Sequence, residues 1–196
     1  MKLKVLLLLA AALLIACNSA FCEGKVIFGF ENNAQGWAIP DWALEKEDYK
    51  AQGIKTSGNF VKEGVSALEL SVNFTDTKWQ GAYIEIEPTE SYDWSAYSTL
   101  LADVYLPKDA PLRLESRFIL TVGEGDDWIW TEMNSSTKLV PGEWNTVKAN
   151  IAPGSTDWKK IEVTDKFRAN VRKVGLRIES KTAYSGPVYI DNIRVQ

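Results

Sequence analysis

Histidine is absent from the 196 residues of the chain. Its absence excludes Ser–His–Asp triads and Cys–His nucleophile pairs, and it removes the commonest ligand of zinc sites. Cysteine occurs only as Cys17 and Cys22, both close to the start of the chain. The rest of the chain therefore cannot form a disulfide between its own strands, and its stability has to come from packing.

An excess of positive charge is also lacking. The formal net charge is −4, and no basic stripe runs along the sequence. Nucleic acid is therefore not expected as a partner, because its phosphates need lysine and arginine for neutralisation. The longest apolar run, residues 5–16, is shorter than the roughly 20 residues that a membrane-spanning helix needs, so we expect no transmembrane span.

Residues 1–22 have the pattern of a secretory signal, with a basic start, a short apolar run and small residues after it. Two processing sites are open. Residues 14–17 resemble the lipobox of bacterial lipoproteins, which would make Cys17 a lipid anchor, whereas residues 20–22 suit cleavage before Glu23. We expect residues 23–196 to be one monomeric domain outside the cytoplasm, either secreted, periplasmic or lipid-anchored at the cell envelope.

Alternation of apolar and polar residues is the dominant pattern after the signal. It predicts nine or ten short strands, and no helix longer than a turn or two. The predicted strands cover residues 25–31, 66–74, 81–87, 100–106, 112–122, 128–133, 143–151, 171–179 and 187–195. A phase slip at Asp191 and Asn192 predicts a β-bulge. This pattern is typical of an all-β fold, an antiparallel β-sandwich or jelly roll.

Tryptophan is abundant, with eight copies, all after the signal. Trp94, Trp144 and Trp158 are expected to contribute to packing. Trp37 and Trp42 bracket a loop after the first predicted strand. Loops at the rim of a sandwich often carry binding residues, so structural and ligand-binding functions are both open for these two.

Trp128 and Trp130 stand two residues apart, so on a strand they point the same way, about 7 Å apart. If Ile129 and Met133 face the core, both tryptophans and Glu132 are exposed together. The reverse arrangement would bury a carboxylate at a high cost in free energy. Two parallel indoles beside a carboxylate suit a sugar, whose apolar face stacks on the rings while its hydroxyls donate to the carboxylate.

Outward residues of the other predicted strands would line a cleft if their sheet is the concave one. They are Tyr83, Glu85, Tyr105, Arg113, Arg117 and Arg177. On the alternative interpretation they form an ordinary solvated sheet face. The candidate ligand-binding residues are therefore Trp37, Trp42, Tyr105, Arg117, Trp128, Trp130 and Glu132.

Six short motifs follow one another in a characteristic order. They are residues 28–31 (FGFE), 36–37 (GW), 64–68 (GVSAL), 103–107 (DVYLP), 141–144 (PGEW) and 185–193 (SGPVYIDNI). Their order and spacing resemble those of galactose-binding-domain-like carbohydrate-binding modules, the β-sandwich modules often appended to β-mannanases, cellulases and xylanases. The resemblance extends over the whole predicted domain, and it implies non-catalytic carbohydrate binding.

The same resemblance implies a structural calcium ion. Such modules commonly hold Ca²⁺ with one acidic residue from the first strand and one from the last. The matching residues here are Glu31 and Asp191. Calcium takes six to eight oxygen ligands, so backbone carbonyls from residues 62–66 would have to complete the site.

Three functions remain open at this point. The leading hypothesis is non-catalytic binding of a polysaccharide or cell-surface glycan. A β-jelly-roll glycoside hydrolase is the first alternative; it would need two carboxylates about 5–9.5 Å apart, with Glu85, Glu115 and Glu132 as candidates. An envelope protein-interaction module, whose exposed aromatic residues meet a protein partner, is the second.

Overall fold

The structure is a computed structural model that describes residues 24–75, 77–124 and 127–196. The predicted signal and the candidate anchor Cys17 lie outside the described residues. Two short helices occur in the described part, α1 (Asp41–Leu44) and α2 (Asp165–Ala169). Neither has the length or the apolar character to cross a membrane.

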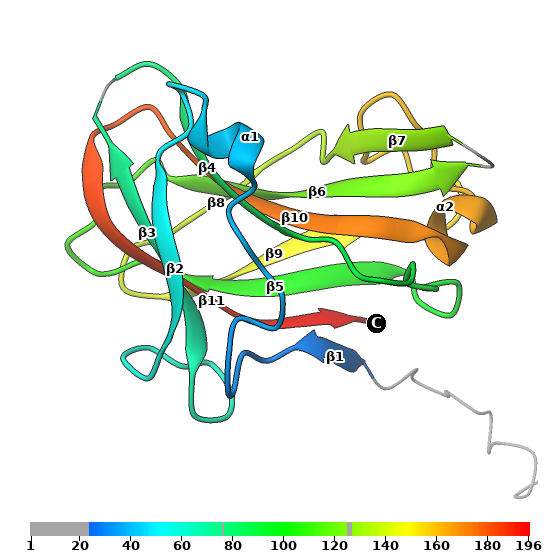
Figure 1. The fold of residues 1–196 in the computed structure, drawn as a ribbon, viewed down its shortest axis with the longest axis horizontal. Helices are drawn as coiled ribbons and strands as arrows, with labels where there is room; N and C mark the ends of the chain where they lie inside the picture. The colour runs from blue at the N-terminus through cyan, green and yellow to red at the C-terminus, as the bar shows by residue number, and fades with distance from the viewer. Residues whose placement is uncertain (1–23, 76, 125–126) are drawn as a thin grey trace, which may run out of the picture.

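Two antiparallel sheets face each other in a sandwich (Figure 1). The six-stranded sheet has the order β2-β3-β11-β5-β9, with β1 paired to β11. Its strands are β1 (Lys25–Phe28), β2 (Ala51–Ser57), β3 (Ala67–Phe74), β5 (Thr99–Tyr105), β9 (Trp144–Asn150) and β11 (Tyr184–Val195). The predicted fold class, an all-β sandwich, is confirmed.

The five-stranded sheet has the order β4-β10-β6-β7, with β8 paired to β6. Its strands are β4 (Gln80–Ile86), β6 (Glu115–Glu124), β7 (Asp127–Glu132), β8 (Thr137–Lys138) and β10 (Val171–Ser180). In Figure 1, α1 lies beside β4, and β7 forms the opposite edge of this sheet. These two edges delimit the surface that carries the candidate site.

The core lies between the two sheets and follows the predicted alternation. On the central strands its fully buried members include Leu100, Ala102, Val104, Val174, Leu176, Ile178, Val188 and Ile190. The predicted bulge is confirmed, because the β11–β5 register shifts between Asp191 and Arg194, and Asn192 has a φ of 49°. The shift lets Ile193 and Val195 continue into the core. Trp94 and Trp158 are also buried there, as predicted.

Four parts of the strand prediction differ from the structure. Strand β2 was not predicted, because its sequence AQGIKTS has no regular alternation, and neither was the two-residue strand β8. The first strand ends at Phe28, and Phe30 takes a φ of 57°. Leu112 was expected in the core but is 70% exposed. Strand β6 begins only at Glu115, and Arg113 just before it has a φ of 100°, which turns the chain away from the sheet.

Candidate functional site

Strand β7 presents two tryptophans on the outer face of the five-stranded sheet. Trp128 and Trp130 are 46% and 48% exposed, while Ile129 packs against the core on the other side of the strand. Their cross-strand neighbours on β6 are small, Gly123 and Thr121. Both side chains are therefore about half accessible, as the alternation predicts, and the Arg172 guanidinium lies over the Trp128 ring.

The opposite edge of the same face carries a second aromatic group, over β4. Trp42 of α1 lies 5.1 Å from Tyr49 and 5.2 Å from Tyr83 between ring centroids, and Tyr49 lies 5.9 Å from Trp79. We call Trp42, Tyr49 and Trp79 the β4-side aromatic cluster. Tyr49 and Trp79 were not predicted as site residues, because the sequence does not show that residue 49 pairs with Gly81 of β4.

A glycine on β10 makes room for the base of this cluster. Tyr83 is buried beneath Trp42, and a Cβ atom at position 175 would lie 2.2 Å from its hydroxyl oxygen. The hydroxyl donates a 2.8 Å hydrogen bond to Glu85 Oε2. Burial, reinforced by that carboxylate, raises the pKa of Tyr83 far above its usual range. Gly175 is thus required for the close approach of the tyrosine ring.

Gly175→Ala is expected to lower the free energy of unfolding by about 1–3 kcal/mol, because Tyr83 and the overlying Trp42 have to move. Chemical denaturation measures this loss. Gly53→Ala is the matched control, since a Cβ atom there meets nothing within 4 Å on strand β2. Equal stability of the two variants would contradict the close packing of Tyr83 on Gly175.

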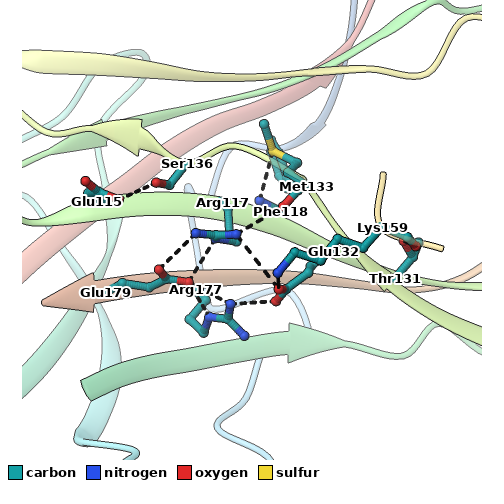
Figure 2. Close-up of polar contacts among 10 residues, drawn as sticks. All are labelled: Glu115, Arg117, Phe118, Thr131, Glu132, Met133, Ser136, Lys159, Arg177 and Glu179. Atoms are coloured by element: carbon teal, nitrogen blue, oxygen red, sulfur yellow. Dashed lines mark hydrogen bonds and ion pairs between the residues drawn. The ribbon is translucent and has the colours of Figure 1, made fainter. Parts of the chain in front are cut away.

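A network of charged side chains joins neighbouring strands of this sheet (Figure 2), and it lines a hollow together with Trp79 and Trp130. Arg177 Nη2 donates to Glu132 Oε2 at 2.5 Å, and Arg177 Nε donates to Glu179 Oε1 at 2.7 Å. Arg117 Nη2 donates to Glu179 Oε2 at 3.1 Å, and Lys159 Nζ donates to Glu132 Oε1. These five residues, named the charged floor here, connect β6, β7 and β10 with the loop after β9.

Glu132 corrects one expectation. It lies on the same face of β7 as the two tryptophans, as predicted, but it is only 6% exposed. Arg177 and Lys159 cover both of its oxygens. The predicted free carboxylate beside the indoles is therefore instead a neutralised part of the charged floor.

The electrostatics of the charged floor favour the ionised forms of Glu132 and Arg177. Burial opposes ionisation of Glu132, but the hydrogen bonds and charges of Lys159 and Arg177 outweigh it and lower the pKa of Glu132. Burial likewise opposes the charge of Arg177, and the carboxylates of Glu179 and Glu132 outweigh it, so its pKa is raised. Such a floor offers fixed charges and hydrogen-bonding groups to a ligand at neutral pH.

Two adjoining hollows open on this face. One, of about 510 Å³, lies over the charged floor between Trp79 and Trp130. The other, of about 480 Å³, extends toward Leu112 and Val140. Both are lined by Trp79, Glu115, Glu179 and Lys181, so they form one continuous groove across the sheet, called the groove below.

Trp37 and Tyr105 lie away from the groove. Trp37 is 3% exposed and packs edge-on against Phe28 at 5.4 Å, because the loop turns back at Gly36 (φ 85°) and inserts the indole into the core. The prediction of a binding function for Trp37 is therefore wrong. Tyr105 lies on the outer face of the six-stranded sheet and stacks on Phe60 at 4.3 Å, on the opposite side of the sandwich.

The face around Tyr105 has a hollow of its own, of about 730 Å³. Phe60, Tyr184 and Tyr189 line it together with Tyr105, and Trp144 lies beside Tyr105 at 5.5 Å. Although this hollow is larger than either of the two that make up the groove, its lining includes no tryptophan pair as exposed as Trp128 and Trp130. The predicted ligand-binding residues that share a single face are Trp42, Arg117, Trp128, Trp130 and Glu132.

Glu31 and Asp191, the predicted calcium ligands, both bind the loop of residues 62–66. Asp191 Oδ2 accepts from the N–H groups of Lys62 and Glu63 at 2.8 and 3.1 Å, and Glu31 Oε2 accepts from Val65 N–H at 2.7 Å. Burial raises the pKa of Asp191, and the charge of Glu31 adds to the rise. Hydrogen bonds from three backbone N–H groups lower that pKa but do not outweigh burial. Two carboxylates from distant parts of the chain thus converge on one loop.

The described residues contain no group of three or more Asp, Glu, His or Cys side chains arranged to hold a metal ion. The site would therefore draw on the two carboxylates of Glu31 and Asp191. A calcium ion there would depend on backbone carbonyls and water for its other ligands. The donor chemistry suits Ca²⁺, which prefers oxygen ligands, rather than zinc.

A family model described as "Mannanase, galactose-binding domain-like" matches residues 28–192. The chain belongs to this family, which confirms the resemblance seen in the sequence motifs. No curated protein matches the chain.

Solved structures with the same fold include several carbohydrate-binding modules. Caldicellulosiruptor saccharolyticus CBM27-1, solved with mannohexaose, is 15% identical with a TM-score of 0.57, covering 88% of this chain and 96% of that one. CBM28, specific for non-crystalline cellulose, is 15% identical with a TM-score of 0.63 over 88% and 96% of the two chains. The CBM22-1 xylan-binding domain from Paenibacillus barcinonensis is 15% identical with a TM-score of 0.51 over 88% and 94%. At these identities the likeness shows the β-sandwich fold.

Proposed function

We propose that this protein is a non-catalytic module that binds a polysaccharide chain along the groove, outside the cytoplasm. The observation that carries the proposal is the pairing of exposed indoles with a polar floor on one face. Trp128 and Trp130 lie at one edge and the β4-side aromatic cluster at the other, and the charged floor lines the hollow between Trp79 and Trp130. Membership of the mannanase-associated family and the shared fold support this interpretation.

The geometry suits an extended ligand that crosses several strands. From β4 to β7 the sheet has three strand intervals, which amount to roughly 14 Å. Aromatic rings at both edges offer stacking surfaces to the apolar faces of separate sugar rings, and burying those faces supplies the hydrophobic term. Lys159 keeps two of its three donors after binding Glu132, so sugar hydroxyls can accept hydrogen bonds between the stacking positions.

Hydrolysis is disfavoured by the state of the candidate carboxylates. A glycosidase needs a general acid whose pKa is raised, whereas the pKa of Glu132 is lowered. Glu115 accepts a hydrogen bond from Ser136, and Glu85 accepts one from Tyr83 and another from Lys173. We therefore expect no release of reducing sugar from any polysaccharide that the protein binds.

A binding screen tests the proposed function. Isothermal titration and tryptophan fluorescence with soluble mannans, xylans, β-glucans and galactans are expected to show saturable binding of at least one of them. Phe60→Ala, an aromatic deletion on the opposite face of the sandwich, is expected to leave that affinity unchanged. A folded protein that binds no polysaccharide would contradict the proposal and favour a protein partner for the exposed indoles.

We also propose that Ca²⁺ binds where Glu31 and Asp191 meet the loop of residues 62–66. The convergence of two carboxylates on one loop supports the site. Gly64 belongs to it as well, since a Cβ atom there would lie 1.7 Å from Glu31 Oε1. Once bound, the ion would tie the start of the chain to β11 and stabilise the fold without taking part in ligand binding.

Calcium is expected to raise the midpoint of thermal unfolding relative to EDTA. At 100 times its dissociation constant the ion would add about 2.7 kcal/mol. Asp191→Asn removes one ligand and is expected to abolish the difference between calcium and EDTA. Magnesium, which demands a tighter octahedral site, is the control ion. Identical unfolding in calcium and EDTA would show that the two carboxylates only hold the loop.

A further inference from the structure

The charges that line the groove differ in sign from the charge of the whole chain. The chain has 22 basic and 26 acidic residues. The two hollows that make up the groove are lined by six basic side chains, Arg113, Arg117, Lys138, Lys159, Arg177 and Lys181. Three acidic side chains, Glu115, Glu132 and Glu179, line the same hollows, so the groove has a net charge of +3 from six positive and three negative groups.

The acidic side chains of the groove are already occupied by protein groups. Arg177 and Lys159 bind Glu132, Arg117 and Arg177 bind Glu179, and Ser136 donates to Glu115. Each acidic side chain of the groove therefore already has a protein partner, whereas some of the basic side chains do not.

Three of the basic side chains remain without an acidic partner. Within the described ranges, Arg113, Lys138 and Lys181 form no ion pair, and all three line the hollow beside Trp79. Neutral sugar hydroxyls do not require full positive charges. Carboxylate or sulfate groups on a glycan would pair with them directly.

Cations also lie next to the aromatic stacking surfaces. The Arg172 guanidinium lies over the Trp128 ring, 4.8 Å from its centroid, and the Arg177 guanidinium lies over the Trp79 ring at 5.4 Å, so each occupies part of a ring face. A sugar stacked on either indole would therefore place an acidic substituent close to a guanidinium. Lys46 lies 5.1 Å from Trp42, but Glu45 and Glu47 flank it in sequence, so the unpaired positive charge concentrates in the hollow that Lys138 of β8 lines.

We infer that the groove prefers an anionic polysaccharide, whose sugars carry carboxylate or sulfate groups, over a neutral one. This inference rests on the proposed function and names the class of its ligand. Stacking on the indoles would be common to neutral and acidic glycans, whereas Arg113, Lys138 and Lys181 would add affinity only for the acidic ones. The added part would weaken as salt screens it, since the Debye length falls from about 30 Å at 0.01 M to about 8 Å at 0.15 M.

The test compares two hexasaccharides with the same β-1,4-linked backbone, mannohexaose and its mannuronate counterpart, by isothermal titration at low and high salt. At low salt the mannuronate is expected to bind about tenfold more tightly, as charge complementarity adds to stacking. That advantage is expected to shrink with added salt, while mannohexaose affinity stays constant. Sulfated mannan replaces the carboxylate by sulfate and shows which anion the groove prefers.

A charge-removal pair locates the effect. Lys138→Gln with Lys181→Gln is expected to lower the affinity for mannuronate far more than the affinity for mannohexaose, and so to abolish most of the preference for mannuronate. Lys108→Gln with Lys148→Gln removes the same charge from the opposite sheet and is expected to change neither affinity. Dextran sulfate, a polyanion of unrelated linkage, is expected to bind much more weakly than mannuronate.

The outcomes separate the inference from the proposed function. Equal or tighter binding of the neutral hexasaccharide would overturn the inference and leave the proposed function standing. The inference would also be overturned if both double variants reduced the preference for mannuronate equally. Binding of dextran sulfate as tightly as mannuronate would overturn it too, since either result indicates general ion exchange. Failure of every neutral and acidic glycan to bind would overturn the proposed function itself.

Discussion

Replacing both Trp128 and Trp130 by alanine is expected to weaken polysaccharide binding by about 30- to 150-fold. Each indole presents one accessible face, and covering it with a sugar is worth about 1–1.5 kcal/mol, so two account for about 2–3 kcal/mol. The free energy of unfolding is expected to fall far less than on removal of a fully buried tryptophan, because both side chains are half exposed in the free protein. Isothermal titration and thermal denaturation of the double variant measure the two quantities.

The contrast with a buried tryptophan makes this prediction specific. Trp158 is 2% exposed and its Nε1 donates to the Asn150 carbonyl at 2.8 Å. Trp158→Ala is therefore expected to cost about 3–5 kcal/mol of stability. Unchanged affinity in the Trp128/Trp130 double variant would place the binding surface elsewhere. A loss of stability as large as that of Trp158→Ala would show that the two indoles contribute to packing instead.

Arg177→Met is expected to cost about 3–5 kcal/mol of the free energy of unfolding at pH 7, a large part of the about 5–15 kcal/mol typical of a domain. The arginine is 6% exposed and binds both Glu132 and Glu179. Its removal leaves two buried carboxylates with only Arg117 and Lys159 as partners. Urea denaturation at several pH values measures the cost.

The pH dependence distinguishes a lost ion pair from lost packing. In the wild type the pKa of Glu132 is lowered below its ordinary 4.5, so its contribution to stability is full above that value and is lost as pH falls through the lowered pKa. In Arg177→Met the Glu132 carboxylate loses the arginine that lowers its pKa, so burial raises that pKa. As pH falls, Glu132 of the variant becomes protonated, and the cost of burying its charge is removed. The stability difference from the wild type is expected to shrink as pH falls toward the ordinary glutamate value of 4.5 and below it. A difference independent of pH would indicate packing alone.

Much of the fold could be predicted from alternation, because strands of a sandwich bury every second residue. The strands from Leu100, Val171 and Pro187 onward place their predicted apolar residues in the core. Strand β2 escaped prediction because its polar sequence at the sheet edge needs no apolar face. Leu112 escaped because a single left-handed residue, Arg113, ends the regular alternation.

The site could be predicted only where local periodicity determines it. Trp128 and Trp130 were found because two residues on one strand share a face. Trp79 and Tyr49 were missed, since their meeting with Trp42 depends on how loops fold onto β4. The burial of Glu132 was missed for the same reason, because its partners come from β10 and from the loop that holds Lys159.

The most direct test of the binding face is a two-dimensional ¹⁵N NMR titration that follows the eight tryptophan indole N–H signals during addition of polysaccharide. If the groove binds the glycan, the signals of Trp79, Trp128 and Trp130 shift, with Trp42 beside them. Those of buried Trp37, Trp94 and Trp158 and of Trp144, on the opposite face, stay in place. A titration in which Trp144 shifts while Trp128 and Trp130 do not would contradict the account and transfer binding to the face of Tyr105.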